Sequence, residues 1–268
     1  MRASSFAAAA AGLFVFSSAV SPLGAQPVED VASAEHLGAL APANIARPRP
    51  APPFDLTGTW QHTPTGPDSW RFVPDELELT PEAQAHYDAG ERARAEGNIY
   101  RDDIGQCWPA GMPLIMTRVW PIDMIQLPTA IYMISHFMNS LRVIFLDGRT
   151  HSDPDVVVPS WNGESIGRWE DDTLVVETRY FPGHHHWIDQ GGASVPASDQ
   201  LRIVERIRML DDDTLEIEFA MTDPKSWVGE WKTTKLFGRH HDIDIAEVEC
   251  LPDLNENLPA TSSQSLVQ

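Results

Sequence analysis

From residue 112 onward, short runs of apolar and β-branched residues alternate with turn-forming residues. This pattern is typical of β-strands joined by tight turns, and Asp147-Gly148 is one such turn dipeptide. The segment 201–210 shows the alternation clearly, because every second residue is apolar apart from Glu205. The predicted strands are residues 114–127 (broken at Pro121), 130–137, 140–147, 173–181, 201–210, 214–221, 230–237 and 243–249.

One α-helix is predicted over residues 80–96, with Thr80 as its N-cap, Pro81 at its first position and Gly97 at its end. Its many alanines suggest a thin helix that lies on a sheet. Consecutive antiparallel strands with few helices form a sandwich or a closed barrel, because an open sheet would leave unprotected edges. The mix of 22 Pro, 17 Gly and 9 Trp also favours strands and turns over a helical bundle.

The N-terminal fifty residues differ from the rest of the chain. Arg2, an apolar run over residues 6–20 and small residues ending at Ala25 have the layout of a secretory signal peptide, predicted as residues 1–25. The alternative is a membrane anchor, but the apolar run is shorter than the ~20 residues that span a bilayer. Residues 26–53 are rich in Pro and Ala and are expected to form a linker, so the folded domain is expected at 54–257, followed by a disordered tail at 258–268.

Export would place the chain in the periplasm or outside the cell, where a disulfide can persist. Cys107 and Cys250 are the 2 cysteines of the chain, so a single pairing is available, and we expect a disulfide between them. Two free buried thiols are the alternative. The formal net charge of -20 repels nucleic acid and anionic membrane surfaces. Stable membrane insertion and nucleic-acid binding are therefore not expected, and a homodimer is left open.

Several motifs resemble a known family. They are Phe54-Asp-Leu-Thr-Gly-Thr-Trp60, Cys107-Trp-Pro-Ala-Gly-Met-Pro113, Leu146-Asp-Gly-Arg149 with His151, Trp161-Asn-Gly-Glu-Ser-Ile-Gly-Arg-Trp-Glu170, Asp172-Thr-Leu-Val-Val-Glu-Thr178 and Thr222-Asp-Pro224. Together they resemble a large family of exported, β-rich, lipocalin-like proteins of Gram-negative bacteria.

That resemblance implies a lipocalin-like barrel in which the Trp of the first strand closes the floor. It also implies a cofactor-free lyase acting on lignin-derived aromatic molecules, because some sphingomonad proteins are loosely associated with the family. The segment Gly183-His-His-His186 departs from the family pattern, so no role is carried over to it.

Strand alternation singles out two charged residues. Glu205 shares a face with Leu201, Ile203 and Ile207, and Arg142 shares a face with Ile144. A carboxylate in an apolar cavity has a raised pKa and can act as an acid or base, and an inward Arg can stabilise an anion. The alternative is a structural ion pair between Glu205 and an inward Arg such as Arg142 or Arg168.

Histidines and aromatic residues supply the other candidates. His136 follows Tyr132 and Ile134 on one strand face and is expected to reach the cavity, with a satisfied core histidine as the alternative. On an extended chain, at most His184 and His186 can share a site. A metal site there would need further ligands from His151, His240, His241 or Asp242, and no paired metal-binding motif is present.

The segment Gly163-Glu-Ser165-Ile-Gly167 matches the Gly-x-Ser-x-Gly sequence of a nucleophile elbow. It lacks the alternating β/α context of that motif, so it is interpreted as a loop entering a strand.

These observations give three hypotheses. The first is an exported, cofactor-independent lyase or isomerase in which Glu205, Arg142, His136, His184 and His186 are catalytic, while Tyr132, Tyr180, Trp187 and His151 contact a small aromatic substrate. The second is a non-catalytic binding protein for an apolar ligand, and the third is a metal-dependent enzyme using residues 184–186. An unpaired inward Glu205 favours the first hypothesis, and a complete pair between Glu205 and an Arg favours the second.

Overall fold

The computed structural model describes residues 37–66, 69–74, 77–96, 107–189 and 194–251. All of them belong to one compact unit that begins at Leu37. The predicted signal peptide and the predicted C-terminal tail lie outside the described residues.

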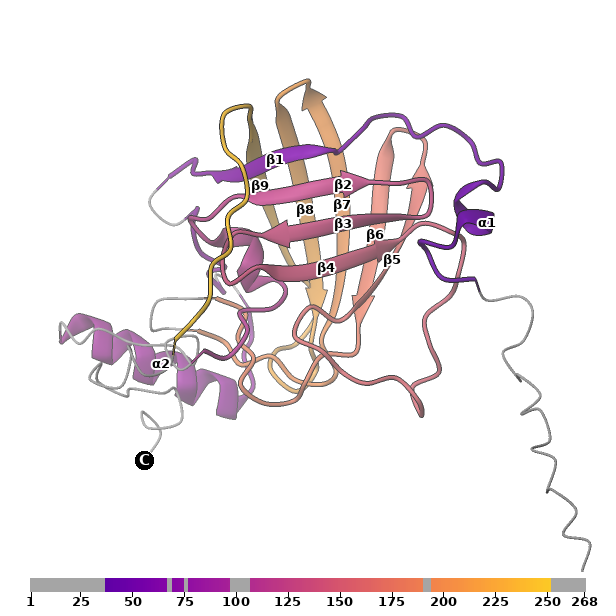
Figure 1. The fold of residues 1–268 in the computed structure, drawn as a ribbon. Helices are drawn as coiled ribbons and strands as arrows, with labels where there is room; N and C mark the ends of the chain where they lie inside the picture. Colours follow the sequence, from indigo (N-terminus) through magenta and orange to yellow (C-terminus); the bar gives the residue numbers. More distant parts are fainter. Residues whose placement is uncertain (1–36, 67–68, 75–76, 97–106, 190–193, 252–268) are drawn as a thin grey trace, which may run out of the picture. The chain divides into compact units, whose positions relative to one another are not determined.

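Nine strands form a closed barrel in which the first strand pairs with the last (Figure 1). All pairs are antiparallel except β4 and β5, which run parallel. The prediction of a mainly β, mostly antiparallel barrel is therefore confirmed. The strands are β1 (Gly58–Thr63), β2 (Ile122–Gln126), β3 (Ala130–Ser135), β4 (Ser140–Phe145), β5 (Glu164–Glu170), β6 (Thr173–Arg179), β7 (Arg202–Asp211), β8 (Thr214–Thr222) and β9 (Trp231–His240).

The strand predictions need three corrections. Residues 114–117 form a 3-10 turn, η2 (Leu114–Thr117), and the strand begins only after Pro121, because proline lacks the backbone donor that a ladder needs. Strand β5 begins at Glu164 and so covers most of the segment Gly163–Gly167, which was interpreted as a loop entering a strand. The predicted strand at 243–249 does not form, because β9 pairs with β1 and β8 and the barrel is complete before residue 243.

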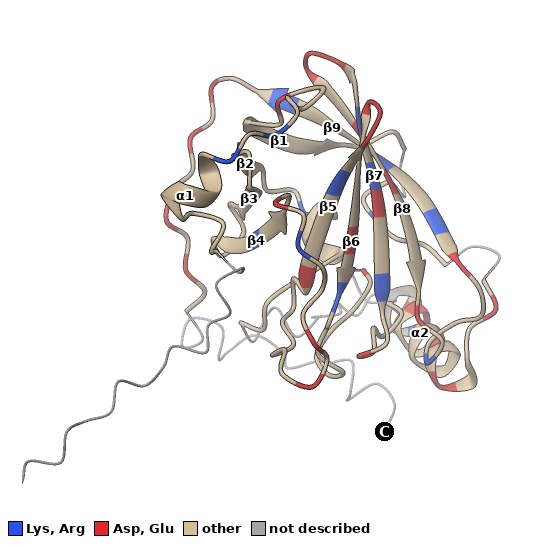
Figure 2. Ribbon diagram, turned by 90° about the vertical axis from the view of Figure 1, so that its right-hand side faces the viewer, with Lys and Arg blue, Asp and Glu red and all other residues tan. Residues whose placement is uncertain are grey.

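Helix α2 (Pro81–Ala95) forms as predicted, and Thr80 Oγ1 accepts a hydrogen bond from the Ala83 N–H. It lies beyond the strand ends rather than on a strand face, which corrects the expected position (Figures 1 and 2). Its buried alanines are packed there, and His86 contacts Trp187 with ring centroids 5.6 Å apart. No helix among the described residues has the length and apolar character needed to cross a membrane.

The barrel interior is packed with side chains from alternate strand positions, with Met, Ile and Leu from most strands and Phe219 and Phe237 from β8 and β9. Trp60 is fully buried on β1, as the Gly-x-Trp motif predicts, and its Nε1 donates to the Leu56 carbonyl. The Arg239 guanidinium covers its ring at 4.2 Å. The outer face of β5–β8 instead carries interleaved charges, such as Glu177 between Arg179 and Arg202 (Figure 2).

Residues 37–53, which we expected to belong to a linker, contact the barrel. A short helix, α1 (Pro42–Ile45), buries Asn44, whose Nδ2 donates to Asp147 at 3.0 Å. The Ala39 carbonyl accepts a hydrogen bond from Thr129. The proline-rich stretch that follows cannot form a helix, but the Phe54 carbonyl at its far end accepts a hydrogen bond from Gln126 Nε2 at 3.1 Å. The folded unit therefore begins earlier than Phe54.

Candidate functional site

The barrel interior contains a buried ion pair between Arg142 of β4 and Glu205 of β7. Glu205 has no exposed surface, and Arg142 is 3% exposed. Arg142 Nη1 donates to Glu205 Oε1 at 3.0 Å, and Nη2 donates to Glu205 Oε2. The strand alternation therefore placed both residues correctly, and the other proposed partner, Arg168, points outward and pairs with Glu170.

The surroundings of this pair satisfy the remaining guanidinium donors. Arg142 Nε donates to Ser165 Oγ at 3.0 Å, and Nη2 also donates to Thr178 Oγ1 at 3.0 Å. The two hydroxyls lie 2.9 Å apart and hydrogen-bond each other. The adjoining cavity beside Arg142 and Met133 measures about 10 Å³, which is the room of one water molecule rather than a ligand.

His136 lies outside the barrel interior, contrary to our expectation. Tyr132 and Ile134 are half-exposed, while Ile131 and Met133, at the alternate positions, are buried. His136 follows on the outer side, where its Nε2 is 3.3 Å from Asp123 Oδ1. The error arose because both faces of β3 are apolar, so alternation alone does not say which one faces inward.

The histidine segment also differs from the prediction. His185 has a φ of 50°, so the chain is not extended there, and the rings of His184 and His185 lie 5.6 Å apart. His185 stacks on Trp108 with ring centroids 4.2 Å apart. The His186 ring instead contacts Phe181, with ring centroids 5.2 Å apart.

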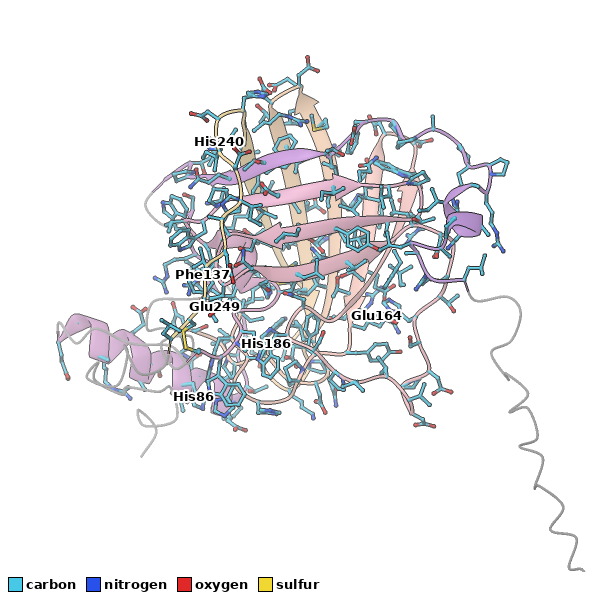
Figure 3. The ribbon with its side chains drawn as sticks, in the orientation of Figure 1. His86, Phe137, Glu164, His186, His240 and Glu249 are labelled. Atoms are coloured by element: carbon cyan, nitrogen blue, oxygen red, sulfur yellow. A yellow bond between two sulfur atoms is a disulfide. The ribbon has the colours of Figure 1, made fainter. Side chains whose placement is uncertain are left out.

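His186 is fully buried and its Nε2 hydrogen-bonds the Met112 carbonyl at 2.6 Å. Burial lowers the pKa of His186 to about 4, against the smaller opposing effect of this hydrogen bond. Figure 3 shows His240 far from His186, although both were named as candidate metal ligands. Within the part of the chain that the structure describes, no group of three His, Cys, Asp or Glu side chains could hold a metal ion.

The predicted substrate contacts fall in separate places. His151 Nδ1 is 2.9 Å from Glu164 Oε2, and the Tyr180 hydroxyl donates to the Ser152 carbonyl at 2.7 Å, so these residues brace a surface loop. Trp187 is buried against His86. His151, Tyr180 and Trp187 thus have partners other than the Arg142–Glu205 pair.

Sequence reasoning missed a second polar group in the barrel. Lys235 of β9 is 5% exposed and pairs in register with the buried Ile217, so it points inward. Nearby, His62 is also buried, and its pKa is lowered to about 4 by burial and by the charge of Lys235. The alternation of Trp231, Thr233, Lys235 and Phe237 along one strand face was the signal that could have identified it.

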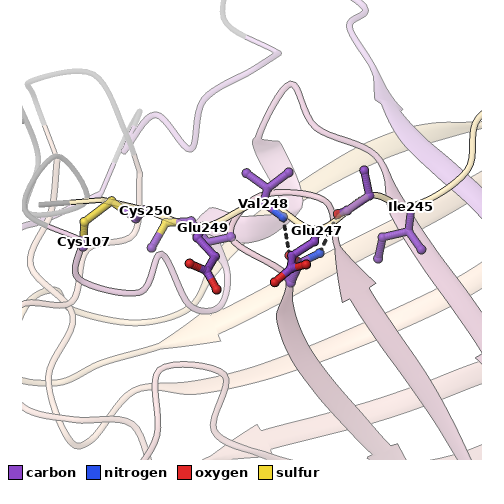
Figure 4. A pocket seen from close by; sticks show the side chains of 9 residues that line it. Cys107, Ile245, Glu247, Val248, Glu249 and Cys250 are labelled. Carbon is purple, nitrogen blue, oxygen red and sulfur yellow. Dashed lines mark hydrogen bonds between the residues drawn. A yellow bond between two sulfur atoms is a disulfide. The ribbon is translucent and has the colours of Figure 1, made fainter. Parts of the chain in front are cut away.

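Three surface pockets are larger than the interior cavity. A pocket of about 770 Å³ lies where β1 begins and β2 and β4 end, and we call it the Trp169 pocket. Another of about 710 Å³ lies beside the disulfide, along residues 245–250 (Figure 4). A third of about 510 Å³ lies where β1 ends and β9 begins, and we call it the Lys235 pocket.

Comparison with known proteins adds no assignment: no family model matches the chain, and neither does any curated protein.

Proposed function

We propose that this chain is a non-catalytic binding protein for a small, largely apolar molecule, which it holds in the Trp169 pocket. The observation that carries the proposal is the complete Arg142–Glu205 pair, because it occupies the interior position that a catalytic acid or base would need. Both oxygens of this carboxylate are hydrogen-bonded, and the adjoining cavity of about 10 Å³ is too small to bring a substrate to them.

The size and lining of the Trp169 pocket support the proposal. Its volume of about 770 Å³ falls in the range of small-molecule sites, roughly 300–1,000 Å³. Trp169 forms one wall and contacts Phe54 edge to face at 4.9 Å. Apolar side chains supply most of the remaining lining, namely Ile45, Pro50, Ala51, Pro52, Pro53, Leu127, Pro128 and Leu146.

Charged groups at the edge of the pocket hold the proline-rich wall in place. Burial alone would raise the pKa of Asp147, but hydrogen bonds from Arg149 and Asn44 outweigh it and lower the pKa to about 2. Asp147 is therefore ionised at neutral pH and fixes Asn44 of α1 beside the pocket. Arg49 donates to the Asn44 carbonyl at 2.7 Å, which keeps the following prolines near the barrel.

An uncharged fluorescent probe tests this site. N-phenyl-1-naphthylamine should bind the wild-type protein with one-to-one stoichiometry. Replacing Trp169 by Ala should weaken binding about tenfold or more, because a large aromatic wall is lost. The matched control is Trp120→Ala, which removes an exposed indole that does not line the pocket. Equal dissociation constants for the wild type and a folded Trp169→Ala variant would contradict the proposal.

Export is part of the same proposal. The secretory-signal layout and the family resemblance both suggest that the mature chain begins near Gln26 in the periplasm or outside the cell. The bond between Cys107 and Cys250 supports this location, because such bonds persist in oxidising compartments. The intact mass of protein isolated from its own host should match a chain that starts at or near Gln26, and a soluble cytoplasmic form that retains residues 1–25 would contradict export.

A further inference from the structure

The Lys235 pocket lies at the opposite end of β1 from the Trp169 pocket, and the charge of its lining differs from that of the whole chain. The chain has 39 acidic and 19 basic residues. Among the described residues, the lining of this pocket contains the basic residues Arg71, Lys232 and Lys235 and the acidic residue Glu230. An excess of positive charge around a concave site attracts anions. The pocket is therefore a place where a strongly acidic protein can bind an anion.

Neighbouring carboxylates already balance two of the three basic side chains. Lys232 pairs with the acidic residue of the lining at 2.9 Å. Arg71 pairs with Asp189 at 3.0 Å and with Glu91 at 3.8 Å. No carboxylate among the described residues forms a salt bridge with Lys235, although the charge of Asp189 acts on it without a direct contact. Lys235 is therefore the cation of this pocket that lacks a partner carboxylate.

The contacts of the Lys235 amine favour an ammonium group. Its Nζ donates to the Ser69 carbonyl at 2.7 Å and to the Arg71 carbonyl at 2.6 Å. The Phe72 ring lies 5.0 Å from Nζ, where the π-electrons of the ring attract a positive charge. An ammonium group has three N–H donors, and the described residues accept hydrogen bonds from two of them. The third N–H is left for a ligand.

This ammonium lies at the wall of the pocket. Lys235 is 5% exposed, and the two residues whose carbonyls hold it, Ser69 and Arg71, line the same pocket. Burial lowers the pKa of Lys235, because the charged form loses its contact with water. A bound anion would compensate this loss. Because the other two cations are already paired, one negative charge suffices, which favours a carboxylate over a doubly charged phosphate.

The rest of the lining indicates the kind of molecule that carries the carboxylate. Thr233 lies two positions before Lys235 on β9 and pairs in register with the buried Phe219, so both side chains point to the inner side of the strand. The structure shows no hydrogen bond from the Thr233 hydroxyl to the described residues. The other hydroxyl-bearing and apolar side chains of the lining are Thr65, Ser69, Thr234, Val73, Leu77 and Trp231. This mixture suits a small molecule with both hydroxyl and apolar groups.

We propose that the Lys235 pocket binds the carboxylate of a small hydroxylated molecule, with the Lys235 ammonium and the Thr233 hydroxyl as the donors. The volume of about 510 Å³ leaves room for an apolar body beside these donors. A charge-assisted hydrogen bond is roughly twice as strong as a neutral one, so the charge of the ligand should determine its affinity. No described residue lines both this pocket and the Trp169 pocket, so the two sites are separate.

Mandelate and mandelamide test the role of the charge, because the second replaces the carboxylate of the first by a neutral amide. Titrations of the full chain at pH 7, followed by saturation-transfer NMR, measure both dissociation constants. The wild type should bind mandelate about tenfold or more tightly than mandelamide. Saturating N-phenyl-1-naphthylamine should leave the dissociation constant of mandelate unchanged. Equal affinities, no binding of mandelate, or competition between mandelate and the naphthylamine would each overturn the proposal.

Variants of the two donors locate the site. Lys235→Met should weaken the binding of mandelate far more than that of mandelamide, so the preference for the anion should disappear. Lys225→Met is the matched control and should keep the preference, because Lys225 pairs with Asp199 at 2.6 Å and does not line the pocket. Thr233→Val, which keeps the shape of the side chain, should weaken mandelate binding about threefold or more.

The Thr233→Val measurement decides the question if Lys235→Met does not fold. Wild-type affinity for mandelate in Thr233→Val or in a folded Lys235→Met variant would overturn the proposal. An equal loss of both ligands in Lys235→Met would do the same, because it would show that Lys235 only holds the backbone of residues 69 and 71 in place.

Discussion

Replacement of Glu205 by Gln removes one charge of the buried pair and leaves the Arg142 guanidinium unneutralised in the barrel interior. Breaking such a pair from one side costs roughly 3–5 kcal/mol of stability. We expect urea unfolding of Glu205→Gln to show a loss of this size, with any probe binding at the Trp169 pocket unchanged while the protein is folded.

The matched control is Glu170→Gln, which makes the same chemical change in an ion pair on the outer face of β5. Its unfolding midpoint should stay close to the wild-type value, because water replaces the lost contacts. A stable Glu205→Gln variant that has lost a measurable lyase or isomerase activity would instead restore the acid–base hypothesis and reject a structural role for the pair.

His186 links stability to pH. Its pKa is about 4 in the folded chain and near 6.5 when unfolded, so between these values the unfolded chain binds more protons. Stability must therefore fall as the pH decreases from 6.5 towards 4, by up to about 3 kcal/mol for this residue. His186→Gln should show a smaller loss of unfolding free energy over that interval.

His184 supplies the comparison for this pH effect, because this neighbouring histidine is exposed whereas His186 is buried. Unfolding free energies measured from pH 4 to pH 7 should have the wild-type slope in His184→Gln. An unchanged slope in His186→Gln would show that this buried ring does not govern the acid sensitivity.

Strand alternation located Glu205 and Arg142 because each lies on an otherwise apolar face. It could not show that the two side chains meet, because β4 and β7 are not neighbours in the barrel and their approach depends on closure. Strand alternation also could not predict the positions of His184 and His185. The left-handed backbone at His185 interrupts the two-residue alternation of side chains along an extended chain.

At the level of elements, β5 was missed because charged residues and Gly167 interrupt its apolar pattern. A Cβ at Gly167 would lie 2.7 Å from Leu146 Cδ2 and 2.9 Å from Ile144 Cγ2. This glycine therefore allows the close approach of β5 to β4. The strand was predictable only with knowledge of its neighbour.

Gly167→Val should destabilise the barrel by about 1–3 kcal/mol, because the added atoms must displace core side chains. Gly183→Ala is the control, since a Cβ there makes only ordinary contacts of 3.6 Å or more. Thermal unfolding of both variants measures the effect, and equal midpoints would show that β4 and β5 can separate without cost.

At the scale of the molecule, the disulfide joins residues that are 143 positions apart, with Cα atoms 5.6 Å from each other. On the chain-entropy model, a loop of this length contributes very roughly 5 kcal/mol as an upper value. Reduction, or Cys107→Ser with Cys250→Ser, should lower the urea midpoint. Thiol counting in denatured, non-reduced protein should find no free thiol, and finding two would contradict the bond.

The barrel as a whole was predictable because its strands are short, regularly spaced and separated by turn residues. The pockets were not predictable. Residues of the Trp169 pocket come from α1, the proline-rich segment and three separate turns, and they meet only after the sheet has closed. A pattern along the chain contains no information on that convergence.

Closure between β1 and β9 has a consequence for folding during synthesis of the chain. The two strands are the first and last of the sheet, so a chain that emerges N-terminus first exposes two unpaired edges until residues 231–240 have been made. Unpaired edges attract other chains. Pairings between sequence-distant strands also form slowly. A nascent chain that ends before β9 is therefore the form most exposed to aggregation, and shielding it from its neighbours matters more than the stability of the finished barrel.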